Sequence, residues 1–183
     1  MTDDVLVRHC APTLAGRKTG SLFSCTFSDQ TTMCFAVRRW NLLLRKCGLR
    51  VLPLRHQNER WLIYVYRPAL LRLDLSIPAA QLLLRERGYR SVLEIDCLRR
   101  VMHRLQTSAI FPHEIGLFLG YPTEDVRGFI EKGPQRSKYT GAWRVYGDVA
   151  EAKRRFAIFD HCKAVCCAKL HAGASIDRIA VTD

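Results

Sequence analysis

The sequence lacks the long hydrophobic runs from which a membrane protein or a secreted precursor would be recognised. Arginines interrupt its longest apolar stretches every few residues, and none approaches the roughly 18 apolar residues of a membrane span. The acidic start, Met1 to Asp4, leads into no apolar segment of the kind that a secretory signal contains. These absences predict a cytoplasmic protein that does not enter the membrane.

Closely spaced cysteine pairs are also missing. The chain has eight cysteines, but no two of them stand in a CxxC spacing, so neither a zinc ribbon nor a thioredoxin-like motif is indicated. In a reducing cytoplasm we expect free thiols, most of them packed as small core side chains. Because repeats, low-complexity segments and linkers are absent as well, the sequence favours a single domain over residues 1–183.

Acidic residues are scarce relative to basic ones, at 17 against 29, which gives a net charge of +12. Residues 1–110 hold 18 Lys and Arg against 8 Asp and Glu, whereas residues 111–183 hold 11 against 9. An anionic partner would explain this charge, since basic surfaces attract phosphates. The alternative is compositional: a GC-rich genome favours arginine codons, and the 22 arginines form no dense block.

The spacing of apolar residues predicts an α+β fold. Helices are expected over residues 4–9, 31–46, 70–75, 78–87, 91–105 and 148–171, and short strands over 22–27, 49–55, 60–66 and 143–146. Residues 49–66 form a β-hairpin, and Pro53 places its first strand at a sheet edge. We expect the other two strands to join it in a small mixed or antiparallel sheet packed against several helices. Residues 148–171 are then a long C-terminal helix.

Ser91 and Glu94 have the spacing of a capping box at the start of the fifth predicted helix. Asp148 and Glu151 have the same spacing at the start of the last one.

Residues 111–131, FPHEIGLFLGYPTEDVRGFIE, predict a helical hairpin. Gly120 ends the first short helix, and Pro122 prevents it from continuing. Gly116 lies inside that helix, where glycine costs about 1 kcal/mol relative to alanine. We therefore expect something to approach its backbone closely, a neighbouring helix more than a ligand.

The same stretch has the spacing of a helix-turn-helix, which makes nucleic-acid binding through residues 113–131 an alternative. Its second helix begins with Glu124 and Asp125, however. These carboxylates would repel phosphates, although they suit the positive end of a helix dipole. A purely structural helical hairpin is the competing interpretation.

Three stretches together resemble one known family: HCAPTLAGRKTGSLFS (residues 9–24), FPHEIGLFLGYPTEDVRGFIE (111–131) and GAWRVYGDVAEAKRRF (141–156). In order and spacing they are similar to the proteins catalogued as domain of unknown function number 3793, found mainly in anaerobic Firmicutes. The resemblance implies a single small cytosolic domain and brings no established activity, cofactor or catalytic residue. Relatives often carry cysteines where this chain has Lys138-Tyr139-Thr140, which argues against a metal or thiol site at that loop.

The first candidate site combines His9 and Cys10 with Thr13 and Lys18. A thiolate beside an imidazolium or a lysine has a lowered pKa, which suits nucleophilic, redox or metal chemistry. The turn predicted at CAPTLAG would add backbone N–H groups able to hold an anion, with Lys18 as counter-charge. Alternatively, Cys10 is buried and His9 ends a helix, because adjacent helical residues point about 100° apart.

Cys162 and Cys166 lie four residues apart and share one helix face. With His9 and Cys10 they are the candidate metal ligands, although zinc would need further ligands from elsewhere. The alternative to metal binding is that both cysteines pack in the core, because they follow Phe159 on the same predicted helix.

Trp143 and Tyr146 could stack on a flat ligand, or they could belong to a half-buried strand. His113 and Glu114 form a candidate acid–base pair, although adjacent side chains diverge. Tyr121 completes the set of candidate ligand-binding residues.

The main hypothesis is the binding of a small anionic ligand or a metal-containing cofactor, with thiol chemistry at Cys10 as an option. The pocket would form where residues 9–18 meet residues 111–125 and 143–148, because irregular Gly/Pro-rich turns commonly hold function. The alternative is nucleic-acid binding through the arginine-rich residues 38–104. The sequence names no cofactor, reaction or oligomeric state.

Overall fold

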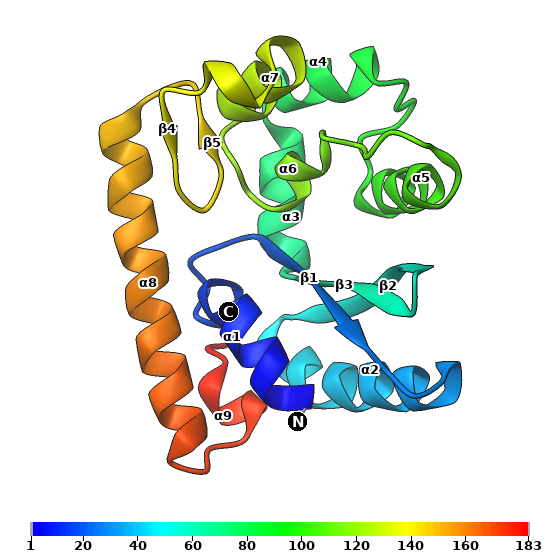
Figure 1. Cartoon of the computed structure of the whole chain (residues 1–183), viewed down its shortest axis with the longest axis vertical. Helices are drawn as coiled ribbons and strands as arrows, with labels where there is room; N and C mark the ends of the chain where they lie inside the picture. The colour runs from blue at the N-terminus through cyan, green and yellow to red at the C-terminus, as the bar shows by residue number, and fades with distance from the viewer. Residues whose placement is uncertain (1, 183) are drawn as a thin grey trace. The chain divides into compact units, whose positions relative to one another are not determined.

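The computed structural model describes residues 2–182 (Figure 1). Its α-helices are α1 (Thr2–Leu14), α2 (Gln30–Leu44), α3 (Pro68–Ser76), α4 (Pro78–Glu86), α5 (Glu94–Thr107), α6 (Ile115–Phe118), α7 (Thr123–Lys132), α8 (Val149–His171) and α9 (Ile176–Ile179). Its strands are β1 (Gly20–Thr26), β2 (Arg50–Gln57), β3 (Arg60–Tyr66), β4 (Tyr139–Thr140) and β5 (Arg144–Val145), and two 3₁₀ turns are η1 (Arg45–Cys47) and η2 (Pro134–Arg136). The structure combines these helices with two small antiparallel sheets, which confirms the predicted α+β class.

The contacts within the chain divide it into two compact units. The first unit contains the residues up to Ala69 together with those from Phe159 onward, and the second runs from Leu70 to Ile158. The single domain expected over residues 1–183 therefore stays a prediction.

The sheet of the first unit has the strand order β1-β3-β2 and is antiparallel throughout. It confirms the predicted hairpin and the strand predicted at residues 22–27. β2 is an edge strand, in agreement with Pro53, which cannot donate a ladder hydrogen bond. The hairpin turns at Asn58 and Glu59, whose φ angles of 50° and 60° belong to a type I′ turn.

Helix α1 is longer than the sequence predicted, because it continues through Pro12 to Leu14. A proline inside a helix costs about 3 kcal/mol. The fully buried side chains of Leu6, Val7 and Leu14 offset this cost, since each contributes about 1.5–3 kcal/mol. The chain turns only at Gly16, which has a φ of 68°. The turn predicted at CAPTLAG is therefore confined to its last two residues, Ala15 and Gly16, whose N–H groups donate to the carbonyls of Ala11 and Thr13. Anion binding by this backbone stays a prediction.

A buried arginine closes this end of α1. Arg67 has no exposed surface, and its guanidinium donates to the carbonyl oxygens of Thr13 at 2.8 Å, Leu14 at 2.9 Å, Cys47 at 3.0 Å and Val181 at 2.9 Å. The last carbonyl groups of a helix lack partners within the helix and carry partial negative charge. One side chain thus joins α1, η1 and the C-terminal segment.

In the second unit, the turn that closes α4 lies at Gly88 as predicted, and this glycine has a φ of 81°. The capping box predicted at the start of α5 is wrong. The Ser91 hydroxyl accepts a hydrogen bond from the Leu93 N–H at 3.1 Å, and Leu93 occupies the N-cap position without a side-chain cap.

Residues 111–131 form two helices separated at Gly120, but the first, α6, is shorter than predicted. A Cβ added at Gly116 would lie 2.7 Å from the Val126 Cγ2 atom of α7, which is too close for two carbon atoms. The close neighbour expected at Gly116 is therefore the second helix.

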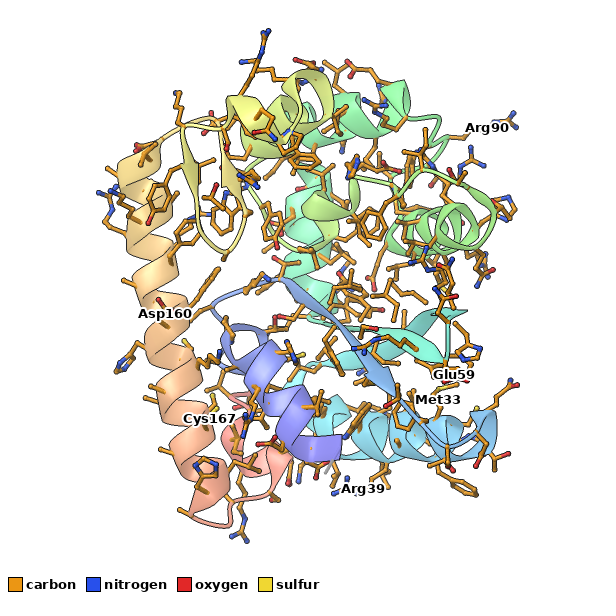
Figure 2. All side chains as sticks on the ribbon, in the orientation of Figure 1. Met33, Arg39, Glu59, Arg90, Asp160 and Cys167 are labelled. Atoms are coloured by element: carbon orange, nitrogen blue, oxygen red, sulfur yellow. The ribbon has the colours of Figure 1, made fainter. Side chains whose placement is uncertain are left out.

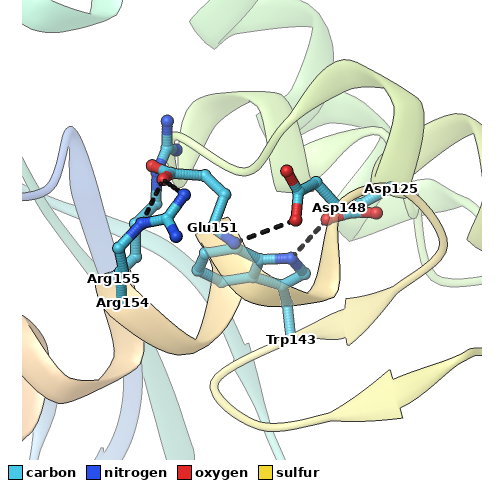
Figure 3. Close-up of polar contacts among 6 residues, drawn as sticks. All are labelled: Asp125, Trp143, Asp148, Glu151, Arg154 and Arg155. Carbon is cyan, nitrogen blue, oxygen red and sulfur yellow. Dashed lines mark hydrogen bonds and ion pairs between the residues drawn. The ribbon is translucent and has the colours of Figure 1, made fainter.

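Residues 143–146 do not join the 49–66 hairpin, and that prediction is wrong. Instead β5 pairs with the preceding β4 in a separate two-stranded sheet, which lies between α7 and the first turns of α8 (Figure 1). Helix α8 begins as predicted, since the Glu151 N–H donates to the Asp148 carboxylate at 3.0 Å (Figure 3).

Candidate functional site

The His9–Cys10 pair of the first unit is split between surface and core. His9 is exposed and stacks on Phe23, with ring centroids 5.7 Å apart and planes at 4°. Cys10 is fully buried, and this burial raises the pKa of its thiol far above the usual range, although Lys18 nearby opposes the shift. A reactive thiolate needs the opposite shift, so the predicted lowering of this pKa is wrong.

Thr13 and Lys18 lie beside that buried thiol. The Thr13 hydroxyl is buried and shares a 2.9 Å hydrogen bond with the Ser21 hydroxyl. Burial lowers the pKa of Lys18 to about 8, and its Nζ lies 5.9 Å from the centroid of the Phe159 ring. Thr13 therefore has a packing role here, and ligand binding by either residue stays a prediction.

The candidate metal ligands Cys162 and Cys166 are both buried on one face of α8. The Cys166 thiol lies 3.9 Å from the carbonyl oxygen of Ala11. Between residues 2 and 182, no three His, Cys, Asp or Glu side chains gather in a way that could hold a metal ion. The core-packing alternative accounts for both cysteines.

In the second unit, Asp125 holds the segment around β5 against α7. Its carboxylate, 3% exposed, accepts a hydrogen bond from the Trp143 indole N–H at 2.6 Å (Figure 3). It also accepts hydrogen bonds from the backbone N–H groups of Tyr146 and Gly147 at 2.6 and 2.8 Å. The first turn of α7 is the part that would enter a DNA groove in a helix-turn-helix. Since the Asp125 hydrogen bonds attach the first turn of α7 to the segment around β5, the geometry favours a structural helical hairpin over DNA recognition.

The aromatic residues proposed to stack on a ligand stack on one another. The Trp143 ring centroid lies 4.9 Å from that of Tyr121, with the ring planes 28° apart, and 4.5 Å from that of Phe156, edge to face. The Tyr146 hydroxyl donates to the Gly133 carbonyl at 2.6 Å. These contacts give Trp143 and Tyr146 packing roles, and their binding to a ligand stays a prediction.

His113 and Glu114 diverge, as adjacent residues should. His113 is exposed, with its ring 4.8 Å from that of Phe129. Glu114 is buried and accepts hydrogen bonds from the Tyr89 hydroxyl at 3.0 Å and from the Arg104 guanidinium at 2.5 Å. Burial, followed by the charge of Glu114, raises the pKa of Tyr89 above its usual range. The pair therefore does not form an acid–base couple.

The pocket predicted from the sequence draws on both units. Residues 9–18 belong to the first unit, and residues 111–125 and 143–148 belong to the second. Their meeting in one pocket stays a prediction.

A different depression lies wholly within the second unit, where α4 gives way to α5. We call it the arginine pocket; it measures about 860 Å³ and is lined by Arg85, Gly88, Tyr89, Arg90, Ser91, Asp96 and Arg100.

The loop between the two helices brings these side chains together. Gly88 ends α4 in a left-handed conformation, in which the Tyr89 N–H donates to the Leu84 carbonyl at 3.0 Å and the Gly88 N–H to the Arg85 carbonyl at 2.9 Å. A Cβ on Gly88 would lie 3.5 Å from the Arg100 Nη2 atom, so the Arg100 guanidinium of α5 lies beside this turn.

The pocket is rich in positive charge. In the part of the chain that the structure describes, the guanidinium groups of Arg85, Arg90 and Arg100 have no carboxylate or carbonyl partner, and all three residues are exposed. The side chain of Arg90 projects outward from the ribbon in Figure 2. Asp96 is the one acidic lining residue, and its ion pair with Arg99 is long, at 3.8 Å. The lining residues therefore carry three positive charges against one negative charge.

Hydrogen bonds to the side chains of Glu114 and Arg104 hold the loop that lines the pocket. Tyr89 is 3% exposed, and its hydroxyl is held by Glu114. Arg104, the other partner of Glu114, also donates to the Arg87 carbonyl at 3.3 Å. Glu114, predicted to bind a ligand, thus supports the loop that lines the pocket.

None of the three pocket arginines belongs to a motif that the sequence makes recognisable. The available signal was regional, since all three fall within residues 38–104, where the basic excess is concentrated. Nothing in that region's spacing distinguishes them from the arginines that have partners.

Residues 6–180 match the model of the family described as "Protein of unknown function (DUF3793)", which is nearly the whole chain. The chain belongs to this family, as its three quoted stretches predicted. The search of curated proteins and the search of solved structures each returned no match. Along residues 2–182, no helix combines the length and the apolar character needed to cross a membrane.

Proposed function

We propose that this member of the family binds a small phosphate-bearing anion in the arginine pocket. The observation that carries the proposal is the meeting of three exposed guanidinium groups, those of Arg85, Arg90 and Arg100, at one depression where none has a partner among residues 2–182. Arginine favours phosphate because its planar fork can donate two parallel hydrogen bonds to two phosphate oxygens.

Clustered cations of like charge repel one another, and this repulsion is relieved when an anion binds between them. The loop that carries them is held by the left-handed turn at Gly88 and by the Tyr89–Glu114 hydrogen bond. A binding site on a fixed loop loses less conformational entropy when the ligand arrives. These features support a specific site over diffuse attraction by the net charge.

The test measures pyrophosphate binding by isothermal titration calorimetry. The test variant carries Arg85→Gln, Arg90→Gln and Arg100→Gln together. Charge-assisted hydrogen bonds contribute about 1.5–3 kcal/mol each, so even one lost bond corresponds to about a tenfold loss of affinity. We expect the triple variant to lose at least that much.

The matched control replaces three exposed arginines of the same unit outside the pocket, Arg136, Arg144 and Arg154, with glutamine. This control removes the same charge, so it isolates the effect of position. We expect its affinity to stay within about threefold of the wild type, because exposed charges are screened over a Debye length of about 10 Å. An equal loss in both variants, or a wild type that binds no pyrophosphate, would overturn the proposal.

Nucleic-acid binding remains the second candidate, because the three unpaired arginines lie in the arginine-rich residues 38–104. A nucleic acid would engage many arginines at once, so its affinity should fall steeply with salt and rise with oligonucleotide length. A small-anion site should show neither a length dependence nor an equal contribution from the control arginines. Single-stranded oligonucleotides of increasing length, titrated at two salt concentrations, separate the two candidates.

A further inference from the structure

Resting on the proposed anion site, we infer that the ligand of the arginine pocket is a sugar phosphate. Its phosphate groups bind the guanidinium groups of Arg85, Arg90 and Arg100, and its hydroxyl groups bind the carboxylate of Asp96. The size of the pocket, its single carboxylate and its lack of an aromatic platform carry this inference.

The pocket has room for a molecule larger than an inorganic phosphate. Its volume is about 860 Å³, whereas one water molecule in the liquid occupies about 30 Å³. A five-atom phosphate would leave most of that space filled with water. Pockets of about 300–1,000 Å³ commonly hold organic ligands of many heavy atoms, so the phosphate is best placed on a larger molecule.

The position of Asp96 indicates that the ligand carries hydrogen-bond donors beside its phosphate. It lies in the first turn of α5, four residues before Arg100, so the two side chains share one helix face. An ionised carboxylate only accepts hydrogen bonds and repels phosphate. Its long ion pair with Arg99, at 3.8 Å with a 42% exposed carboxylate, leaves oxygen lone pairs available. A ligand that carries hydroxyl donors beside its phosphate satisfies both the carboxylate and the arginines.

The aromatic content of the pocket argues for a sugar over a nucleotide. Tyr89 is the one aromatic lining residue, it is 3% exposed, and its hydroxyl is engaged by Glu114. Its ring is therefore not a free face on which a base could stack. Ser91 supplies a further polar contact, because its oxygen accepts from the Leu93 N–H while its hydroxyl hydrogen can still be donated.

The experiment compares two probes, fructose bisphosphate and pyrophosphate, on the wild type and on Asp96→Ala by calorimetry. Removing the carboxylate takes an acceptor from the sugar but takes a repulsive charge from pyrophosphate. We expect fructose bisphosphate to bind about fivefold more weakly and pyrophosphate about twofold more tightly, so the preference for the sugar falls about tenfold. Glu94→Ala, which removes a carboxylate of the same helix turn that pairs with Arg72 outside the pocket lining, should leave the preference unchanged.

Each outcome has a separate meaning. If both probes bind more tightly to Asp96→Ala, the carboxylate acts by charge alone and the sugar phosphate is excluded, while the anion site stands. If the wild type binds neither probe, the proposed function fails together with this inference.

A third arm of the experiment uses phosphatidylcholine vesicles that carry phosphatidylinositol bisphosphate, because a lipid headgroup presents the same phosphate and hydroxyl groups as a sugar phosphate. Binding to these vesicles without binding to free fructose bisphosphate would overturn the assignment to a free sugar phosphate.

Discussion

Arginine has two opposite uses in the two units of this protein. In the first unit, Arg67 is fully buried, and its guanidinium donates hydrogen bonds to four carbonyl oxygens. In the second unit, Arg85, Arg90 and Arg100 are exposed around one depression, and their guanidinium groups bond to no residue between 2 and 182. The first arrangement stabilises the fold, whereas the second leaves hydrogen-bond donors available to a ligand.

This difference shows why the net charge of +12 is a poor guide to function. Arg67 adds to that charge just as Arg90 does, yet its guanidinium is unavailable to any anion. A cation therefore indicates a binding site only when its partners within the folded chain are known.

Removal of the buried guanidinium should have the largest effect. Arg67→Met removes a guanidinium donor from four carbonyl oxygens. Those of Thr13 and Leu14 keep a backbone donor, the N–H groups of Gly16 and Val181. An unsatisfied buried polar group costs about 1–3 kcal/mol. Allowing for relaxation and entry of water, we expect the free energy of unfolding to fall by about 3–5 kcal/mol. Urea denaturation followed by circular dichroism measures this loss. The control is Arg60→Met on β3, an exposed arginine whose guanidinium, among the described residues, bonds only to Ser24, and for it the expected loss is below about 1 kcal/mol. Similar losses in both variants would contradict the assigned role of Arg67.

A buried carboxylate provides the corresponding test in the second unit. Asp125→Asn replaces one of two accepting oxygens with a donor, so the Trp143 indole or the backbone N–H groups of Tyr146 and Gly147 lose their partner. We expect a loss of about 1–3 kcal/mol in unfolding free energy and a change in tryptophan fluorescence. Glu124→Gln, at the exposed neighbouring position, should change stability by less than about 0.5 kcal/mol. Unchanged fluorescence in Asp125→Asn would argue that the β5 segment is held by other contacts.

A buried thiol below the arginine pocket predicts a pH dependence. The Cys97 thiol donates to the Ser91 carbonyl at 3.3 Å, and burial raises its pKa from 9.0 to about 11. Below pH 9 both states keep the proton, so the thiol contributes no pH dependence there. Between pH 9 and 11 the unfolded chain loses the proton that the folded chain keeps, so stability falls as pH rises.

The loss is at most about 3 kcal/mol, at about 1.4 kcal/mol for each pKa unit. Urea titrations from pH 8 to about 11 should show a shallower decline in Cys97→Ala than in the wild type. An unchanged slope would mean that Cys97 does not titrate in this range.

The smallest effect is expected from the exposed arginines. Replacing Arg85, Arg90 and Arg100 with glutamine breaks no internal bond, so the free energy of unfolding should change by less than about 0.5 kcal/mol. A slight gain would follow from the removal of mutual repulsion. Thermal denaturation without ligand measures the effect. A loss of several kcal/mol would place these arginines with Arg67 as structural residues.

The local pattern of the chain predicted much of the fold. The hairpin, its edge strand, the strand before α2 and the cap of α8 all followed from alternation, from Pro53 and from Asp148, because these features depend on neighbours in sequence. The errors came where packing outweighed local preference. Burial of Leu6 and Leu14 extends α1 through Pro12, and β5 pairs with β4 because that partner is close along the chain.

The candidate site was less predictable. The side chains of His9, Cys10, Trp143 and Tyr146 have the chemistry of a binding or catalytic site. Cys10 and Trp143 are buried in the fold, however, and burial raises the pKa of the Cys10 thiol, which makes it less reactive. The arginine pocket left only a regional excess of charge in the sequence. Whether an arginine is free depends on which carbonyl or carboxylate groups the folded chain brings to it.

The sequence by itself determined the family, the α+β class and the basic character of the N-terminal 110 residues. These properties depend on residue order and composition, which are present before the chain folds. Only the tertiary structure decided which arginines donate hydrogen bonds to buried backbone carbonyls and which remain available to a ligand at the surface. That outcome depends on distances between residues far apart in sequence, such as the contact of Arg67 with Val181, and no local pattern encodes them.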